Sequence, residues 1–64
     1  MARVALVHRM RDRHQQRIAH LEARVNTGEF DDVFDRLTTE YALGFNQWAR
    51  DWCATAEQEM LAAA

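Results

Sequence analysis

The chain has 64 residues, a formal net charge of −2, no proline, two glycines and one cysteine. A chain this short forms one domain at most, and it needs cross-links, a metal or a partner to bury a sufficient core. Cys53 has no second cysteine to pair with. One unpaired cysteine is typical of a reducing compartment, which predicts a cytoplasmic protein. The apolar runs are too short for a membrane span, so no membrane partner is expected.

The first predicted element is a helix over about residues 3–26. Apolar side chains recur there at helical spacing, and steps of three and four residues form a heptad pattern along one face. No capping residue precedes this pattern, which predicts that the sequence begins inside a longer element. The heptad positions are Val4, Val7, Arg11, His14, Ile18, Leu21 and Val25.

A turn is expected over residues 26–30, in the stretch "NTGEF". Asn26 or Gly28 can adopt the left-handed conformation that ends a helix. Three acidic residues lie between positions 29 and 32, where negative charge complements the positive end of a helix dipole. The second helix is therefore expected to begin here, with Thr27 or Asp31 as its cap.

The second predicted element is a longer helix over about residues 31–61. Its large side chains continue the three-and-four spacing almost to the end. Thr38, Thr39 and Gly44 are weaker helix formers, so a bend between residues 38 and 45 is the alternative to one continuous helix. The periodic positions are Phe30, Phe34, Leu37, Tyr41, Gly44 or Phe45, Trp48, Trp52, Ala56 and Met60.

The two halves of the chain carry opposite charge. Residues 1–26 contain six arginines and two acidic residues, a net charge of +4. Residues 27–64 contain two arginines and eight acidic residues, a net charge of −6. This asymmetry predicts that the two helices run side by side, within one chain or between copies. The acidic overall balance argues against direct binding of nucleic acid by the basic first helix.

The fold class expected is all-α: a helical hairpin that dimerises into a four-helix arrangement. One hairpin is too narrow to cover so many large rings, and a second copy would cover them. The expected partner is therefore another copy of the chain. The residues predicted for the dimer interface are Val7, His14, Ile18, Leu21, Phe34, Leu37, Tyr41, Phe45, Trp48 and Trp52.

No arrangement of residues in the sequence predicts catalysis, a metal or a cofactor. His8, His14 and His20 are six residues apart, so their side chains diverge around a helix, whereas helical zinc pairs use spacings of three or four. Cys53 has no histidine on its own helix to act as a base, and it is expected to be a small packing residue. Trp48 and Trp52 are either packing residues or the walls of a ligand pocket.

The segment "FDRLTTEYALGFNQWARDW" resembles the C-terminal domain of PadR-like transcriptional regulators. The preceding "MRDRHQQRIAHLEARV" is similar to the charged connecting helix of that family. The resemblance covers about residues 10–60. This chain has Gly44, whereas the family often has a glycine at the position of Ala42. The matching positions are Phe34, Leu37, Glu40, Tyr41, Leu43 and Trp52.

The resemblance implies a non-enzymatic dimerisation and effector-response module. DNA would be bound only through an N-terminal winged helix, which this sequence does not include. Some members of the family respond to small aromatic or hydrophobic ligands, so a small aromatic effector is a further implied partner. The alternative is a stand-alone helical protein for protein–protein interaction, similar to an antitoxin or an adaptor.

Overall fold

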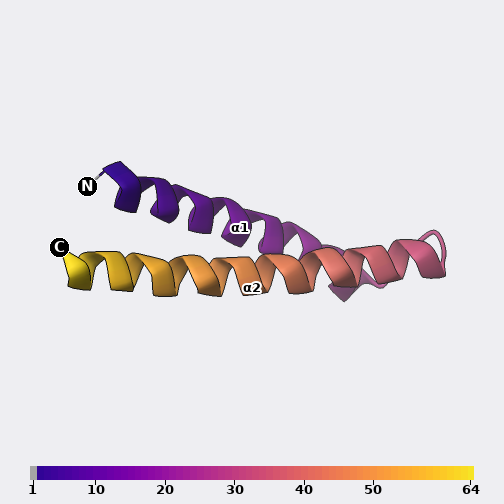
Figure 1. Cartoon of the computed structure of the whole chain (residues 1–64). Helices are drawn as coiled ribbons and strands as arrows, with labels where there is room; N and C mark the ends of the chain where they lie inside the picture. Colours follow the sequence, from indigo (N-terminus) through magenta and orange to yellow (C-terminus); the bar gives the residue numbers. More distant parts are fainter. Residues whose placement is uncertain (1) are drawn as a thin grey trace.

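The computed structural model describes residues 2–64 and contains two long helices. Helix α1 spans Ala2–Thr27, and helix α2 spans Val33–Ala63. The helices lie antiparallel, so the first turn of α1 is near the last turn of α2 (Figure 1). The molecule is a rod of 48 × 14 × 14 Å. The predicted helical hairpin is confirmed, and its helix ends differ from the predicted ones by one or two residues.

The turn between the helices uses glycine at the end of α1. Gly28 has a φ of 67°, and its backbone N–H donates to the carbonyl groups of Arg24 and Val25 at 3.2 Å. This left-handed residue closes the last turn, as expected for Gly28. Thr27 also belongs to this end of α1, because its hydroxyl donates to the carbonyl of Arg24 at 2.8 Å.

The cap of α2 was predicted wrongly. Neither Thr27 nor Asp31 caps the helix; Asp32 does, in an extended conformation, and its carboxylate accepts the backbone N–H of Asp35 at 2.7 Å. In return, the carboxylate of Asp35 accepts the backbone N–H of Asp31 at 3.0 Å. The first bond has the spacing of a capping box, because Asp35 is three residues after the cap, whereas the second bond goes to the residue before the cap.

Asp35 makes the stability of the hairpin depend on pH. The backbone N–H of Asp31 is the largest influence on the pKa of Asp35 and lowers it; desolvation opposes this, and the hydrogen bond and charge of Arg24 lower it further. The folded pKa is therefore below the ordinary 3.8. Asp35 thus contributes stability that is present above pH 3.8 and is lost as pH falls through the folded pKa.

We expect Asp35→Asn to remove this part of the pH dependence. Thermal melting of the wild type should lose stability as pH falls below 3.8, and the variant should show a smaller loss over the same interval. Asp51→Asn is the matched control, because its side chain is 72% exposed and pairs with the adjacent Arg50. Identical melting curves for Asp35→Asn and Asp51→Asn across this interval would contradict the assignment.

Helix α2 is continuous through all of its weaker helix formers. The hydroxyl groups of Thr38 and Thr39 donate back to carbonyl groups one turn earlier in the same helix. Gly44 lies within the regular helix and has a φ in the ordinary helical range. The single long helix is thus confirmed over the bent alternative.

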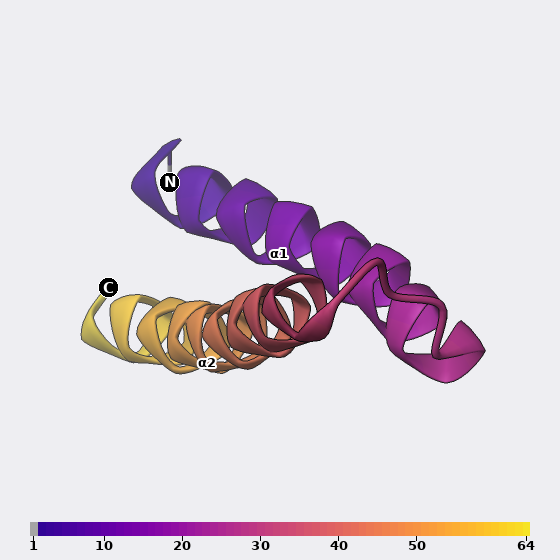
Figure 2. The same ribbon diagram turned by 90° about the vertical axis from the view of Figure 1, so that its right-hand side faces the viewer.

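Helix α1 runs obliquely across α2 (Figure 2), and the core of the hairpin lies between the two helices. Helix α1 contributes two large apolar side chains, Ile18 and Leu21, which are 1% and 5% exposed. The residues that α2 buries are smaller, which lets the two helices approach closely. The buried residues of α2 are Thr39, Asn46, Ala49 and Cys53. Cys53 is therefore a packing residue, as expected.

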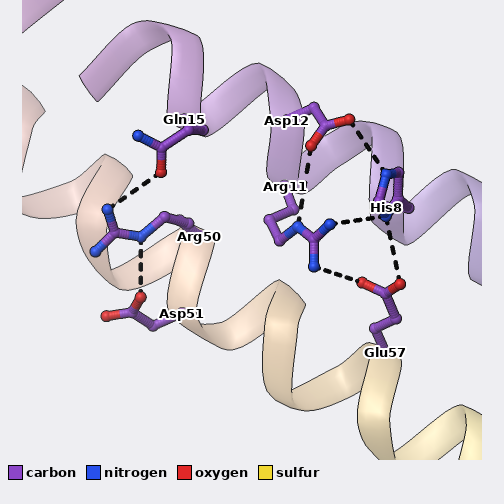
Figure 3. Close-up of polar contacts among 7 residues, drawn as sticks. All are labelled: His8, Arg11, Asp12, Gln15, Arg50, Asp51 and Glu57. Atoms are coloured by element: carbon purple, nitrogen blue, oxygen red, sulfur yellow. Dashed lines mark hydrogen bonds and ion pairs between the residues drawn. The ribbon is translucent and has the colours of Figure 1, made fainter. Parts of the chain in front are cut away.

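One edge of the hairpin is held by polar contacts between the basic and the acidic helix (Figure 3). Nη1 of Arg11 lies 3.0 Å from Oε2 of Glu57, and Nδ1 of His8 lies 3.3 Å from the other oxygen of that carboxylate. Further along, Nη1 of Arg50 donates to the side-chain oxygen of Gln15 at 3.3 Å. The predicted side-by-side placement of the oppositely charged halves is thus found within one chain.

Candidate interaction surface

Six large side chains form a row along α2 that α1 does not cover. We call this row the aromatic stripe. Its members are separated by steps of three or four residues, so they follow the 3.6-residue period of a straight helix. Each is between 50% and 78% exposed. The stripe consists of Phe34, Leu37, Tyr41, Phe45, Trp48 and Trp52.

The aromatic stripe is exposed because α2 has two different faces. Thr39, Asn46 and Cys53 follow a seven-residue period and turn their small side chains toward α1. The aromatic residues follow the 3.6-residue period on a neighbouring face. A helix cannot turn both faces toward one partner helix. Within the hairpin, the contact with α1 uses the small residues, and the large rings remain in solvent.

The ten residues predicted for the dimer interface therefore separate into two groups. Ile18 and Leu21 are buried inside the hairpin, and Val7 and His14 are half-buried on the same face of α1. The structure places these four in the contact between the two helices of one chain. The other six are the members of the aromatic stripe, and all of them lie together on one open surface.

His14 connects the hairpin core to the aromatic stripe. Its Nδ1 lies 2.8 Å from Oδ1 of Asn46, and its ring meets the ring of Phe45 edge-on, with centroids 6.1 Å apart. The side-chain nitrogen of Asn46 donates to the carbonyl of Ala42 at 2.7 Å, which leaves Oδ1 as the acceptor for His14. Nδ1 of His14 therefore carries a proton. This hydrogen bond sets the register of the two helices.

Because His14 and Asn46 are hydrogen-bonded, we expect substitutions at these two residues to have non-additive effects on the free energy of unfolding. His14→Leu leaves the buried amide oxygen of Asn46 without its donor, which costs about 1–3 kcal/mol. Replacing both residues by leucine removes the unpaired polar group as well. The double variant should then lose less free energy of unfolding in urea than the two single variants lose together. Additive losses would contradict the coupling.

A shallow groove runs between α1 and the edge of the aromatic stripe. Its volume is about 280 Å³, and its lining is almost wholly apolar. It is lined by Trp48 and Trp52 from α2 and by Met10 and His14 from α1. Ala49 and Cys53 lie at its floor, with Phe45 beside them.

Neither a cluster of metal ligands nor a membrane-spanning helix is present within residues 2–64. Over these residues, no three histidine, cysteine or acidic side chains gather where they could hold a metal ion. Neither α1 nor α2 has an apolar stretch long enough to cross a bilayer.

Sequence reasoning missed the role of Asn46. A polar residue in the middle of an amphipathic helix gives no sign of its partner, because that partner is 32 positions away in α1. The available signal was the spacing of small residues. Thr39, Asn46 and Cys53 are seven residues apart, and the same period in α1 includes His14.

Comparison with known proteins assigns the chain to a family. Residues 2–60 match the family described as "Virulence activator alpha C-term". None of the curated proteins and none of the solved structures matches the chain. The match covers both helices and the turn between them, and thus most of the chain. The chain therefore belongs to the virulence activator alpha C-terminal family, a family of helical C-terminal domains of regulators.

Proposed function

We propose that the chain is the non-enzymatic dimerisation module of a PadR-like transcriptional regulator that acts in the cytoplasm. Membership of a family of regulator C-terminal domains supports the regulatory role. The order of aromatic and acidic residues in α2 supports the PadR-like assignment. In this proposal, DNA is bound by a winged helix of the parent regulator, and the module sets the distance between two such domains on a palindromic site.

The observation that carries the proposal is the exposure of the aromatic stripe. Tyr41 is 78% exposed, Phe34 is 74% exposed and Trp48 is 63% exposed. Contiguous apolar surface of this kind is typical of a protein interaction site. The hairpin core is also small, with four buried apolar residues among residues 2–64. A second copy placed on the stripe enlarges that core, which is what a chain of this length needs.

The experiment that tests dimerisation is light scattering across a dilution series, with circular dichroism at each concentration. We expect a dimer at micromolar concentration that dissociates on dilution. Helicity should fall along with the dimer mass, because folding and association are coupled when the hairpin core is small. A strongly helical species with the mass of a monomer at micromolar concentration contradicts the proposal.

The groove beside Trp48 and Trp52 supports a second role, the binding of a small aromatic effector. Both indole rings border the groove, and a second copy on the aromatic stripe would lie over its open side. An effector bound there would contact both subunits and so influence their association. Tryptophan fluorescence on addition of a planar aromatic dye tests this role. Unchanged emission at saturating dye contradicts it.

A further inference from the structure

We propose that the groove beside Trp48 and Trp52 takes an amphipathic anion, whose apolar part lies against the two indole rings and whose acidic group binds Arg13 and Arg17. This inference rests on the effector role proposed above and names the chemical class of the effector. It depends on a second groove between α1 and α2, which adjoins the first.

The second groove has a different chemical character from the first. Its volume is about 300 Å³, and Arg13, Arg17 and Asn46 contribute to its lining. Met10 and His14 line both grooves, so the two adjoin each other along α1. Arg17 lies seven positions after Met10, which is roughly 10 Å of helix. A molecule that uses both grooves is therefore elongated, with one apolar end and one end that faces arginine.

The two arginines of the second groove have unused charge. Arg13 and Arg17 make no ion pair within residues 2–64, and both lie at exposed positions of α1. They are one helical turn apart, and like charges at that spacing repel each other. An acidic group bound to both would offset this repulsion. The arginines that already have a carboxylate partner are Arg11, Arg24, Arg36 and Arg50.

The chemistry of the two grooves selects a ligand with both an acidic group and an apolar body. A guanidinium group presents a planar fork of N–H donors, which matches the oxygens of a carboxylate, sulfonate or phosphate. The indole rings offer a large apolar area to the rest of the molecule. In mostly apolar sites, a few polar groups fix the orientation of the ligand. A neutral apolar molecule would leave the arginines unused, and an inorganic anion would leave the indole rings unused.

Two dyes that share one ring system test the proposal. Anilinonaphthalene sulfonate carries an acidic group on its rings, and phenylnaphthylamine is the same molecule without that group. Both change their fluorescence in an apolar environment, so the Kd of each can be measured by titration of the whole chain at low salt. The sulfonate dye reports on the apolar body and the acidic group together, and the neutral dye reports on the apolar body alone.

The variant with Arg13→Gln and Arg17→Gln removes the proposed contacts to the acidic group. We expect it to raise the Kd of the sulfonate dye about tenfold, because two charge-assisted contacts are lost, and to leave the Kd of the neutral dye unchanged. The matched control is Arg3→Gln with Arg9→Gln, which removes the same charge from α1 at residues that line neither groove. The control should change both Kd values by less than about twofold. Circular dichroism checks that both variants remain helical.

The outcomes separate the anionic ligand from the functions proposed above. An unchanged Kd of the sulfonate dye in the Arg13 and Arg17 variant overturns the inference, and binding of the neutral dye then leaves the effector role standing. An equal rise of that Kd in the control also overturns it, because the attraction would come from overall charge. Binding of neither dye overturns both the inference and the effector role.

Light scattering of the same samples distinguishes a ligand contact from a subunit contact. We expect the Arg13 and Arg17 variant to dissociate at the same concentration as the wild type. A midpoint of dissociation shifted to higher concentration would assign the two arginines to the subunit contact and overturn the inference.

Discussion

Ile18→Ala should abolish most of the helical structure of the chain. Ile18 is 1% exposed and, with Leu21, is one of the two large apolar side chains in the hairpin core. Truncating a buried isoleucine to alanine costs about 2–5 kcal/mol, from lost burial and from the cavity left behind. A domain of this size has a total stability of only about 3–10 kcal/mol. The loss therefore takes away most of the free energy that keeps the two helices together.

Circular dichroism and urea denaturation measure this effect. Leu61→Ala is the matched control, since it removes the same number of carbon atoms from a side chain that is 50% exposed, outside both the core and the aromatic stripe. We expect Leu61→Ala to change the free energy of unfolding by less than about 0.5 kcal/mol. If Ile18→Ala unfolds at the same urea concentration as the wild type, the contact between α1 and α2 does not stabilise the chain.

The helical hairpin was predictable from sequence because its signals are local. Helical periodicity, Gly28 and the cluster of acidic residues after it each act within a few positions of the chain. The continuity of α2 through Gly44 was also predictable from the sequence, because the periodic pattern of large side chains continues on both sides of Gly44. The cap was missed for a local reason: three residues that can cap a helix, Thr27, Asp31 and Asp32, lie within six positions. Only the hydrogen bond from Asp35 selects Asp32.

The division of the surface into a core face and an open face was not predictable in the same way. Sequence reasoning assigned importance to large apolar side chains, so Ile18 and Trp52 were placed in one interface. The structure instead buries Ile18 inside the hairpin, whereas the large rings remain exposed. Size alone does not reveal which face of a helix meets its neighbour. The seven-residue period of the small residues in α2 matches that of α1, and this match is the signal that identifies the core face.

The two faces of α2 therefore serve different purposes. The small residues permit close contact with α1 and fix the hairpin, and His14 and Asn46 set its register. The large rings are left for another surface, at the cost of exposing apolar area in the isolated chain. A substitution on the first face should weaken the packing of α1 on α2 within each subunit and so destabilise the folded chain itself. A substitution on the second should act on association, and its effect should depend on concentration.

Trp48→Ala should weaken the dimer while leaving the hairpin able to form. Trp48 is 63% exposed in the single chain, so α1 gains little from its ring. A tryptophan near the centre of an interface typically contributes about 2 kcal/mol or more, which corresponds to a rise in Kd of about thirtyfold. Light scattering across a dilution series should show the midpoint of dissociation shifted to higher concentration by that factor, with circular dichroism following the mass.

The protein concentration needed to restore the folded dimer distinguishes Trp48→Ala from Ile18→Ala. Well above its raised Kd, Trp48→Ala should regain the dimer mass and the circular dichroism spectrum of the wild type, because its hairpin contacts are intact. Ile18→Ala should not recover at that concentration, because its loss of about 2–5 kcal/mol falls on each of the two subunits and so raises the Kd much further. Leu61→Ala again serves as the control and should dissociate at the same concentration as the wild type. A dissociation midpoint of Trp48→Ala equal to that of the wild type would show that the aromatic stripe is not the subunit contact.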